Sequence, residues 1–318
     1  MKKNHATKGT ILMKDTSAPK VKSLYKALRL LDYFDDAHPD AGVTELAAYS
    51  GMLKSSVHNI LQTFELCGYV TQDSETSRYM LGGAAVSLFS RFKETRRIDY
   101  RITEYLQSLR DKFRKDVYFA AKDHDDAVCL CAELETPSGA SYAKVGARTP
   151  LHATSLGKVL LGYSTADEKR AFCAQELPAC TAQTITGGSV LAAELERIIY
   201  DGYATDGGEY QDGLYGIAVP VTLGAEPVQY AIGLASDTPI SGYMQKQYLS
   251  ELRYIAKKIA SVVGDAGDLE NEPGFPKGTH VKDGRIHTPA IICKKEANTL
   301  KPFFPSPAAT RSCSCSQS

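Results

Sequence analysis

The stretch "LKSSVHNILQTFELCGYV" at residues 53–70 decides how the first part of the chain folds. Its apolar residues recur at the spacing of a helix that buries one face: Val57, Ile60, Leu61 and Phe64. The opposite face carries mostly short, uncharged polar side chains: Lys54, Ser55, Ser56, His58, Asn59 and Gln62. Gly68 then ends the helix, and a strand is expected after it. A surface helix usually carries many Lys and Glu residues, so this outward face needs a specific explanation.

The residues just before this stretch explain how the helix is positioned. Thr44 is a good N-cap, which predicts a preceding helix over 44–50. Ala47 is small enough for two helices to cross closely, and Gly51 suits the turn between them. Val57 then fills the angle between the helices. This arrangement of small residues predicts a helix-turn-helix.

The segment "YVTQDSETSRYML" at 69–81 alternates, turns through a polar centre and alternates again, which predicts a two-stranded hairpin. A hairpin after a helix-turn-helix forms a wing. Short hydrogen-bonding side chains on the second helix suit base edges in the major groove of DNA. The predicted DNA contacts are Lys54, Ser55, Ser56, His58 and Asn59, with Arg78 of the wing reaching a phosphate or the minor groove. The alternative is a three-helix bundle with a polar surface helix.

Bulk charge neither supports nor excludes a nucleic-acid partner. The 318 residues hold 37 Lys and Arg against 37 Asp and Glu. Residues 20–80 hold six basic and eight acidic residues, so DNA binding would depend on local contacts, dimerisation and a basic arm at 1–19, expected to be disordered. No apolar run approaches the ~20 residues of a membrane span, and the N-terminus does not resemble a signal peptide. A cytoplasmic protein without a membrane partner is expected.

The eight cysteines follow neither a disulfide nor a C-x-x-C pattern. Cys129 and Cys131 are expected on the same side of a strand, as small buried side chains. The pair Cys313 and Cys315 leaves a redox or metal role open, although neither a metal nor a cofactor is predicted.

Residues 84–114 are predicted to form one helix that links the first domain to a second and also packs against a second copy of the chain. Apolar residues follow helical spacing along it: Leu88, Phe92, Ile98, Ile102, Tyr105, Leu109 and Phe113. A helix that packs only on its own chain is the alternative.

The remaining chain mixes strands and helices. Strands are expected near 117–123, 127–135, 141–148, 203–210, 215–223 and 228–235, with helices within 151–164, from Thr165, and over 190–203 and 242–263. This order predicts an α+β domain around an antiparallel sheet. Residues 265–318 lose all periodicity and are expected to be a disordered tail.

Taken in order, these motifs resemble the IclR family of bacterial transcription regulators from Val21 to Val263. The matching stretches are "KSLYKALRLLDYF", "VTELAAYSGMLKSSVHNILQTFELCGYV", "RYMLG", "LHATSLGKVLL", "GYATDGGEY" and "IAVPV". The resemblance implies a winged helix-turn-helix domain (20–82), a linker and dimerisation helix (83–114) and a GAF-like effector-binding domain (115–264). It also implies homodimers or tetramers on double-stranded DNA. Control of carbon-source or aromatic-compound metabolism is common in the family.

The resemblance further implies an effector site. The loop of Thr154, Ser155 and Leu156 matches a pocket edge, and Asp206 matches an acidic pocket position. An effector would act by changing how two C-terminal domains sit, through different affinity for two arrangements. The sequence leaves open whether DNA release or recruitment of RNA polymerase follows.

The chain departs from the family pattern at four positions. Asn59 stands where Arg is frequent, which favours adenine over guanine. Gly216 replaces a frequent Cys, and Gly233 and Ala235 replace frequent Ser residues. These losses predict a wider, less polar cavity and a larger ligand, such as an aromatic compound, instead of a two- or three-carbon acid. Refilling by neighbouring side chains, or no effector at all, is the alternative.

Other function classes have weaker support. An enzyme could pair Asp206 and Glu209 with His124 or His152, but three residues along a strand place two side chains on opposite faces. His152 is expected to be a structural, hydrogen-bonded histidine. No nucleophile elbow, P-loop, zinc motif or dinucleotide fingerprint is present in the sequence. A ligand-independent oligomeric DNA-binding protein, or an oligomerisation or sensor module without DNA binding, is the remaining alternative.

Overall fold

The computed structural model describes residues 19–35, 37–135, 143–224 and 227–264, and the backbone of 280–282 and 285–287. The chain divides into two units, Met1–Asp265 and Ala266–Ser318. In the second unit, β10 (His280–Lys282) and β11 (Arg285–His287) pair antiparallel, where no regular structure was expected. The N-terminal arm to residue 18, the rest of the tail and the pair Cys313 and Cys315 lie outside the described residues.

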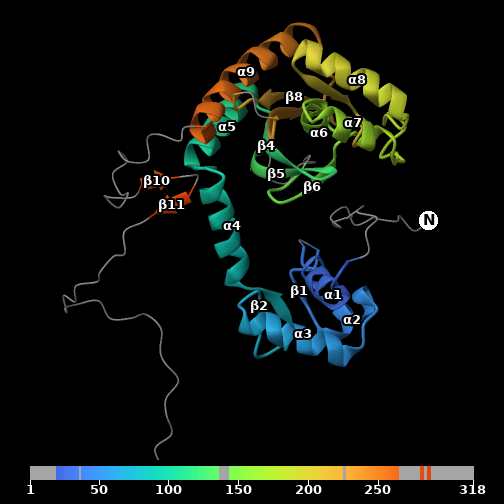
Figure 1. The fold of residues 1–318 in the computed structure, drawn as a ribbon, viewed down its shortest axis with the longest axis vertical. Helices are drawn as coiled ribbons and strands as arrows, with labels where there is room; N and C mark the ends of the chain where they lie inside the picture. The colour runs from blue at the N-terminus through green and yellow to red at the C-terminus, as the bar shows by residue number, and fades with distance from the viewer. Residues whose placement is uncertain are drawn as a thin grey trace, which may run out of the picture. The chain divides into compact units, whose positions relative to one another are not determined.

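The first domain is a winged helix-turn-helix, as predicted (Figure 1). Its elements are α1 (Lys22–Leu31), β1 (Asp40–Ala41), α2 (Val43–Ser50), α3 (Lys54–Leu66), β2 (Val70–Gln72) and β3 (Tyr79–Leu81). The strands form a sheet in the order β1-β3-β2. The hairpin of β2 and β3 was predicted, whereas β1 was not, because a two-residue strand beside Pro39 shows no alternation.

The packing of α2 against α3 follows the small-residue arrangement. Ala47, Val57 and Leu61 are buried in one core, with Ile60 and Phe64 partly buried beside them. Gly51 takes a left-handed conformation (φ 66°), and its N–H donates to the carbonyl of Ala47. The predicted geometry is therefore confirmed.

The start of α2 differs from the prediction. The N-cap is Gly42 and not Thr44, and the helix begins at Val43. The carboxylate of Glu45 accepts a hydrogen bond from the N–H of Gly42 at 2.9 Å. This bond joins the side chain of the third helical residue to the backbone of the N-cap, so the helix starts earlier than the position of Thr44 suggested.

The single helix predicted over 84–114 is two helices, α4 (Gly83–Thr95) and α5 (Tyr100–Phe113). Arg97 has a left-handed backbone (φ 54°), which ends the first helix. Asp99 then caps the second, because its carboxylate accepts from the N–H of Arg101 at 2.8 Å. The break separates two environments: α4 buries no residue within the described chain, whereas α5 packs on the second domain.

The second domain contains a six-stranded antiparallel sheet in the order β6-β5-β4-β9-β8-β7. Its strands are β4 (Asp116–Asp123), β5 (Asp126–Glu133), β6 (Arg148–Pro150), β7 (Ala204–Gly207), β8 (Tyr215–Val221) and β9 (Tyr230–Ser236). The α+β prediction is therefore confirmed. Of the strand expected over 141–148, residues 143–147 are not strand and Arg148 begins β6, while residues 141 and 142 lie outside the described residues.

Helices cover both faces of this sheet (Figure 1). One face packs against α6 (Ser155–Gly162), α7 (Ala166–Cys173) and α8 (Gly188–Asp201), and it is here called the effector face because residues predicted to bind an effector lie on it. The other face packs against α5 and α9 (Gly242–Gly264). Within the described ranges, no helix is long and apolar enough to cross a membrane.

A β-bulge separates the two cysteines of β5. Phe119 of β4 pairs with Cys131, and the next residue, Ala120, pairs with Cys129, so Leu130 is an extra residue in its strand. Cys129 consequently packs on the effector face and Cys131 on the opposite face. Both cysteines are buried, as expected. The prediction that they lie on the same side of the strand was wrong, because the bulge interrupts the alternation of side chains.

Gly233 of β9 lies against β8 so closely that a side chain does not fit. A Cβ atom built there would lie 2.7 Å from the carbonyl oxygen of Ile217 and 2.9 Å from the Cβ of Ala218. We expect Gly233→Ala to lower the free energy of unfolding by about 1–3 kcal/mol, as overpacking does. Urea unfolding checks this against Gly207→Ala, where a Cβ meets nothing within 4 Å. Equal stability of the two variants would contradict the close packing.

Candidate DNA-binding surface and effector site

The N-terminal half of α3 forms a polar exposed surface. Its predicted DNA contacts are all exposed: Lys54, Ser55, Ser56, His58 and Asn59. On the other side of the helix, Val57 and Leu61 are fully buried. The first turn of α3 contains no acidic residue. Its free N–H groups and the positive end of the helix dipole therefore suit a phosphate as well as base edges.

Arg78 is engaged inside the winged domain. Its guanidinium bonds the carboxylate of Asp40 and lies 2.8 Å from the carboxylate of Glu45. It therefore links β1 and α2 to the residue that precedes β3. A DNA phosphate would have to compete with two carboxylates for this group, so contact of Arg78 with DNA stays a prediction.

The strand register brings predicted effector residues into one row. Asp206 of β7 pairs with Gly216 of β8, which pairs with Ala235 of β9, which pairs with Asp116 of β4. Cross-strand partners share a face, and this is the effector face that holds Tyr118. The row therefore has an acid at each end and two very small residues between them. Adjacent strands lie about 4.8 Å apart, so the row spans roughly 14 Å.

The loop predicted as a pocket edge starts α6 over this face. Thr154 is the N-cap, and its hydroxyl accepts from the N–H of Gly157 at 3.0 Å. Thr154, Ser155 and Leu156 are all buried. Since α6 packs across β7, β8 and β9, the structure brings the loop to the same face as Asp206.

Asp206 has one carboxylate oxygen with partners and one without. Its Oδ1 accepts from the N–H groups of Gly208 at 3.0 Å and Glu209 at 2.6 Å. Its Oδ2 is buried and has no hydrogen-bond partner in the described part of the chain. Burial raises the pKa of Asp206 to about 7, the carboxylate of Glu209 adds to the rise, and the backbone N–H groups oppose it.

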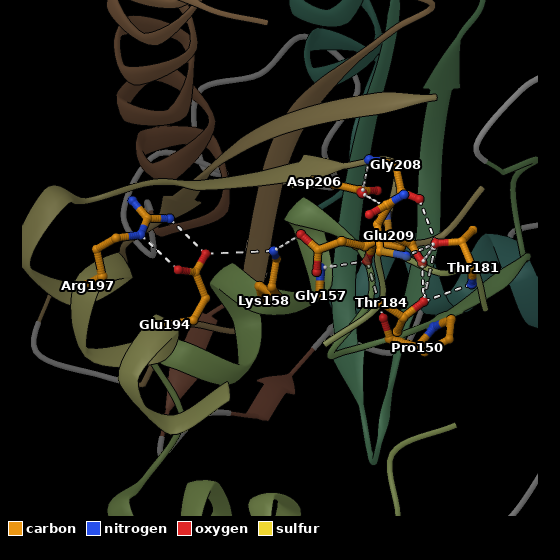
Figure 2. Close-up of polar contacts among 12 residues, drawn as sticks. Pro150, Gly157, Lys158, Thr181, Thr184, Glu194, Arg197, Asp206, Gly208 and Glu209 are labelled. Carbon is orange, nitrogen blue, oxygen red and sulfur yellow. Dashed lines mark hydrogen bonds and ion pairs between the residues drawn. The ribbon is translucent and has the colours of Figure 1, made fainter. Parts of the chain in front are cut away.

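The expectation that Asp206 and Glu209 point to opposite faces was wrong. β7 ends at Gly207, and Gly208 turns the chain with a left-handed backbone (φ 89°). Glu209 therefore belongs to a turn, and strand alternation does not apply to it. Thr181 and Thr184 fix this turn by donating to the carbonyls of Gly208 and Glu209 (Figure 2).

A buried lysine joins this turn to α6. Figure 2 shows Lys158 between two carboxylates, 2.5 Å from Glu209 and 3.7 Å from Glu194. Glu194 is in turn 2.8 Å from Arg197. Lys158 is only 1% exposed, and these two carboxylates offset the cost of burying its ammonium group. Sequence reasoning missed it, although a single lysine in the otherwise apolar "SLGKVLLG" was an available signal.

Asp116 was also missed, and Gly233 does not act as expected. The Tyr118 hydroxyl donates to Oδ2 of Asp116 at 3.1 Å, and the Glu135 N–H donates to Oδ1 at 2.9 Å. No sequence signal marks Asp116, because only strand pairing puts it in the row.

The space expected at Gly233 is filled by β8, so this position provides close packing instead of a wider cavity.

The histidines weighed for catalysis lie elsewhere or have structural roles. His124 follows the last residue of β4, at the opposite end of that strand from Asp116, and pairs with Asp123. His152 is buried, and its Nε2 lies 2.9 Å from the carbonyl oxygen of Pro178, which confirms a hydrogen-bonded structural histidine. Within the described residues no cluster of three potential metal ligands occurs.

A winged helix-turn-helix followed by a helix-covered antiparallel sheet with a polar row defines a class of protein, the ligand-responsive DNA-binding regulator. The chain belongs to the IclR family. The model for the bacterial transcriptional regulator IclR C-terminal domain matches residues 93–261, and the model for the IclR helix-turn-helix domain matches residues 23–74. The protein is therefore a sequence-specific DNA-binding transcriptional regulator whose output a small-molecule effector modulates.

Relatives agree with this assignment. The HTH-type transcriptional regulator KdgR of Escherichia coli is 28% identical over 79% of this chain and 95% of its own length. The glycerol operon regulatory protein of Streptomyces coelicolor is 27% identical over 64% of this chain and 80% of its own length. An IclR homolog from Microbacterium hydrocarbonoxydans, crystallised with 4-hydroxybenzoate, shares the fold with a TM-score of 0.66 at 19% identity, covering 76% of this chain and 98% of that one.

The raised pKa of Asp206 predicts a pH-dependent stability. The folded carboxyl holds its proton up to about pH 7, whereas the unfolded one loses it near 3.8, so stability from this group falls as pH rises between these values. Asp206→Asn keeps an oxygen for the turn and removes the charge. We expect the melting temperature of Asp206→Asn minus that of wild type to increase by several degrees from pH 5 to pH 8. Each kcal/mol of stability that only wild type loses corresponds to about 2–4 °C.

Thermal melts of both proteins across that range check this prediction, with the exposed Asp212→Asn as the matched control. If the melting temperatures of wild type and Asp206→Asn change in parallel with pH, the buried carboxyl does not lower the stability of wild type as pH rises.

Proposed function

We propose that the protein acts as a homodimer whose two α3 helices read an operator, and that an effector bound on the effector face changes operator binding in genes for carbon-source or aromatic-compound use. The DNA-binding part of this proposal is supported by the polar N-terminal half of α3, whose exposed face lies opposite the buried Val57 and Leu61. A helix held this way presents its first turns to base edges in the major groove.

The metabolic part of the proposal rests on relatives. One regulates a glycerol operon, and another is an acetate operon repressor, at 27% identity over 64% of this chain. The homolog crystallised with 4-hydroxybenzoate shows that an aromatic compound can occupy a protein of this fold. These relatives support a role for this chain in regulating catabolic genes.

Base preference depends on Asn59. An Asn side chain forms a bidentate pair with adenine, whereas the Arg that is frequent at this position in the family prefers guanine. Asn59 is exposed on the same face as Ser56, one turn earlier. We therefore expect an operator with adenine where relatives with Arg read guanine.

Dimerisation is supported by α4. This helix buries none of its residues within the described chain, although it carries Val86, Leu88, Phe89 and Phe92. Leu88 and Phe92 are one helical turn apart and are 49% and 37% exposed. A second copy of the chain would cover this apolar face. Two α3 helices would then meet half-sites roughly 34 Å apart, or a multiple of this distance.

The effector would act through α6. Its first turn carries the loop from Thr154, and its buried Lys158 contacts the turn that follows Asp206. A ligand between α6 and the row would favour one arrangement of the domain, and it can shift DNA binding only by its different affinity for the two arrangements. Either release of DNA or recruitment of RNA polymerase could follow.

The DNA-binding role predicts a selective loss. We expect Ser56→Ala with Asn59→Ala to weaken operator binding by about 30-fold or more, because each of the two lost base contacts costs about 1–3 kcal/mol. Binding of any ligand should stay unchanged. Fluorescence anisotropy with the protein's own promoter fragment measures this, and Gln247→Ala with Ser250→Ala on α9 is a matched control. An unchanged affinity would remove α3 from the interface.

The dimer role of α4 predicts dissociation. Leu88→Glu with Phe92→Glu puts two charges on the apolar face, and burial of each original side chain is worth about 1.5–3 kcal/mol. We expect the dimer dissociation constant to rise by about 100-fold or more in sedimentation equilibrium. The exposed pair Ser87→Glu with Arg91→Glu on the same helix should change it little. If both double variants stay equally dimeric, the interface lies elsewhere.

A further inference from the structure

Arg78 is the only basic residue between Val70 and Leu81, the segment that forms the wing. A single cation on a wing would be expected to contact a phosphate, but this one is bound inside the domain. We infer that Arg78 is a positioning residue, which fixes the base of the wing to β1 and α2, and that its guanidinium is not a phosphate contact. This inference rests on the proposed function, in which α3 reads the operator.

The first reason is how fully the guanidinium is used. Its Nε bonds the carboxylate of Asp40, and its Nη2 donates to the backbone carbonyl of Asp40 at 3.2 Å. Nη2 and Nη1 also donate to the two carboxylate oxygens of Glu45, at 2.8 and 3.3 Å. Only one N–H group, on Nη1, is then left without an acceptor among the described residues. A two-pronged contact with a phosphate would therefore require Arg78 to release one of these acids.

The second reason is the charge around the guanidinium. Two carboxylates face this single cation, so acids outnumber the base in the cluster. The N–H of Gly42 and the guanidinium of Arg78 both lower the pKa of Glu45, which keeps this carboxylate ionised at neutral pH. A phosphate brought to Arg78 would also meet these acids, and like charges repel one another.

The third reason is where Arg78 lies in the wing. It directly precedes β3, and its carbonyl accepts from the N–H of Asp73 at 2.8 Å, which closes the base of the wing. β2 has its own link to α3, because the N–H of Gln72 donates to the carboxylate of Glu65 at 3.1 Å. On the other side of the hairpin, β1 and β3 pair over only two residues each. The guanidinium therefore adds a side-chain link where the backbone pairing is short.

The same contact reaches the helix-turn-helix. Glu45 lies in the first turn of α2 and also accepts from the N–H of Gly42, the N-cap of that helix. Arg78 therefore connects the base of the wing to the start of α2, on which α3 packs. A wing that is linked to both helices keeps its position relative to the face of α3 that is proposed to read the operator.

The exposure of the cluster indicates a role in geometry. The side chains of Arg78, Asp40 and Glu45 are 36%, 41% and 43% exposed. Exposed ion pairs contribute little to stability, whereas a planar guanidinium bound to two acids holds them in one defined arrangement. Loss of this contact should therefore change the position of the wing more than the stability of the domain.

Arg78→Lys tests the inference, because it keeps the charge and removes the planar fork. A lysine can still bind a phosphate as a point charge, so a phosphate contact would survive this change. We expect the affinity for a DNA fragment that wild type selects from a random-sequence pool to fall by about 10-fold in fluorescence anisotropy. Hydrogen exchange of the DNA-free protein should become faster in peptides that cover β1 and β3. Arg91→Lys, at an exposed arginine of α4, is the matched control and should change neither quantity.

Asp40→Asn with Glu45→Gln tests the same contact from the other side. Both changes make the winged domain more positive, and a glutamine can still cap α2. If Arg78 positions the wing, DNA binding weakens by about 10-fold despite the more favourable charge. If DNA binding is unchanged or becomes tighter, the acids are not needed to hold Arg78, and the inference is overturned.

Two results with Arg78→Lys would also overturn the inference: a DNA affinity equal to that of wild type, or unchanged hydrogen exchange in β1 and β3. The proposed function fails separately, if wild type selects no sequence from the pool. The hydrogen-exchange comparison needs no DNA, so it still decides in that case whether Arg78 holds the wing.

Discussion

The ion pair between Lys158 and Glu209 is the contact on which the effector face depends. Lys158 is only 1% exposed and is paired with the carboxylate of Glu209, and removing one partner of such a buried pair typically costs about 3–5 kcal/mol. The pair therefore ties the first turns of α6 to the turn after β7. Since that turn is also bound to the carboxylate of Asp206, one buried contact sets the position of α6 relative to Asp206.

The two domains separate stability from recognition in the same way. In the winged domain, Ala47, Gly51 and Val57 fix how α3 packs, and the side chains proposed to contact DNA are exposed and take no part in the core. In the effector domain, α6 and the turn after β7 fix the face, and Oδ2 of Asp206 is left without a partner within the described residues. In each case a packed frame presents polar atoms that take no part in the packing of the core.

Several features were predictable because they depend on local spacing. The stripe of Val57 and Leu61, the turn at Gly51 and the capping box of Thr165 with Glu168 each involve residues within a few positions of one another, and all were found. Three of the errors arose where a periodic pattern was extended across an irregularity. The helix over 84–114 breaks at Arg97, alternation in β5 fails at the bulge, and Glu209 lies in a turn instead of a strand.

The sequence by itself determined the winged helix-turn-helix, the exposed polar face of α3 and the α+β class of the second domain, and it led to the prediction that Thr154 and Asp206 belong to an effector site. These follow from spacing, capping and resemblance. Only the tertiary structure placed Asp116 in the same row as Asp206, paired Lys158 with Glu209 and filled the space beside Gly233. The physical reason is that strand register and burial join residues far apart in the chain, and no local pattern encodes which residues they join.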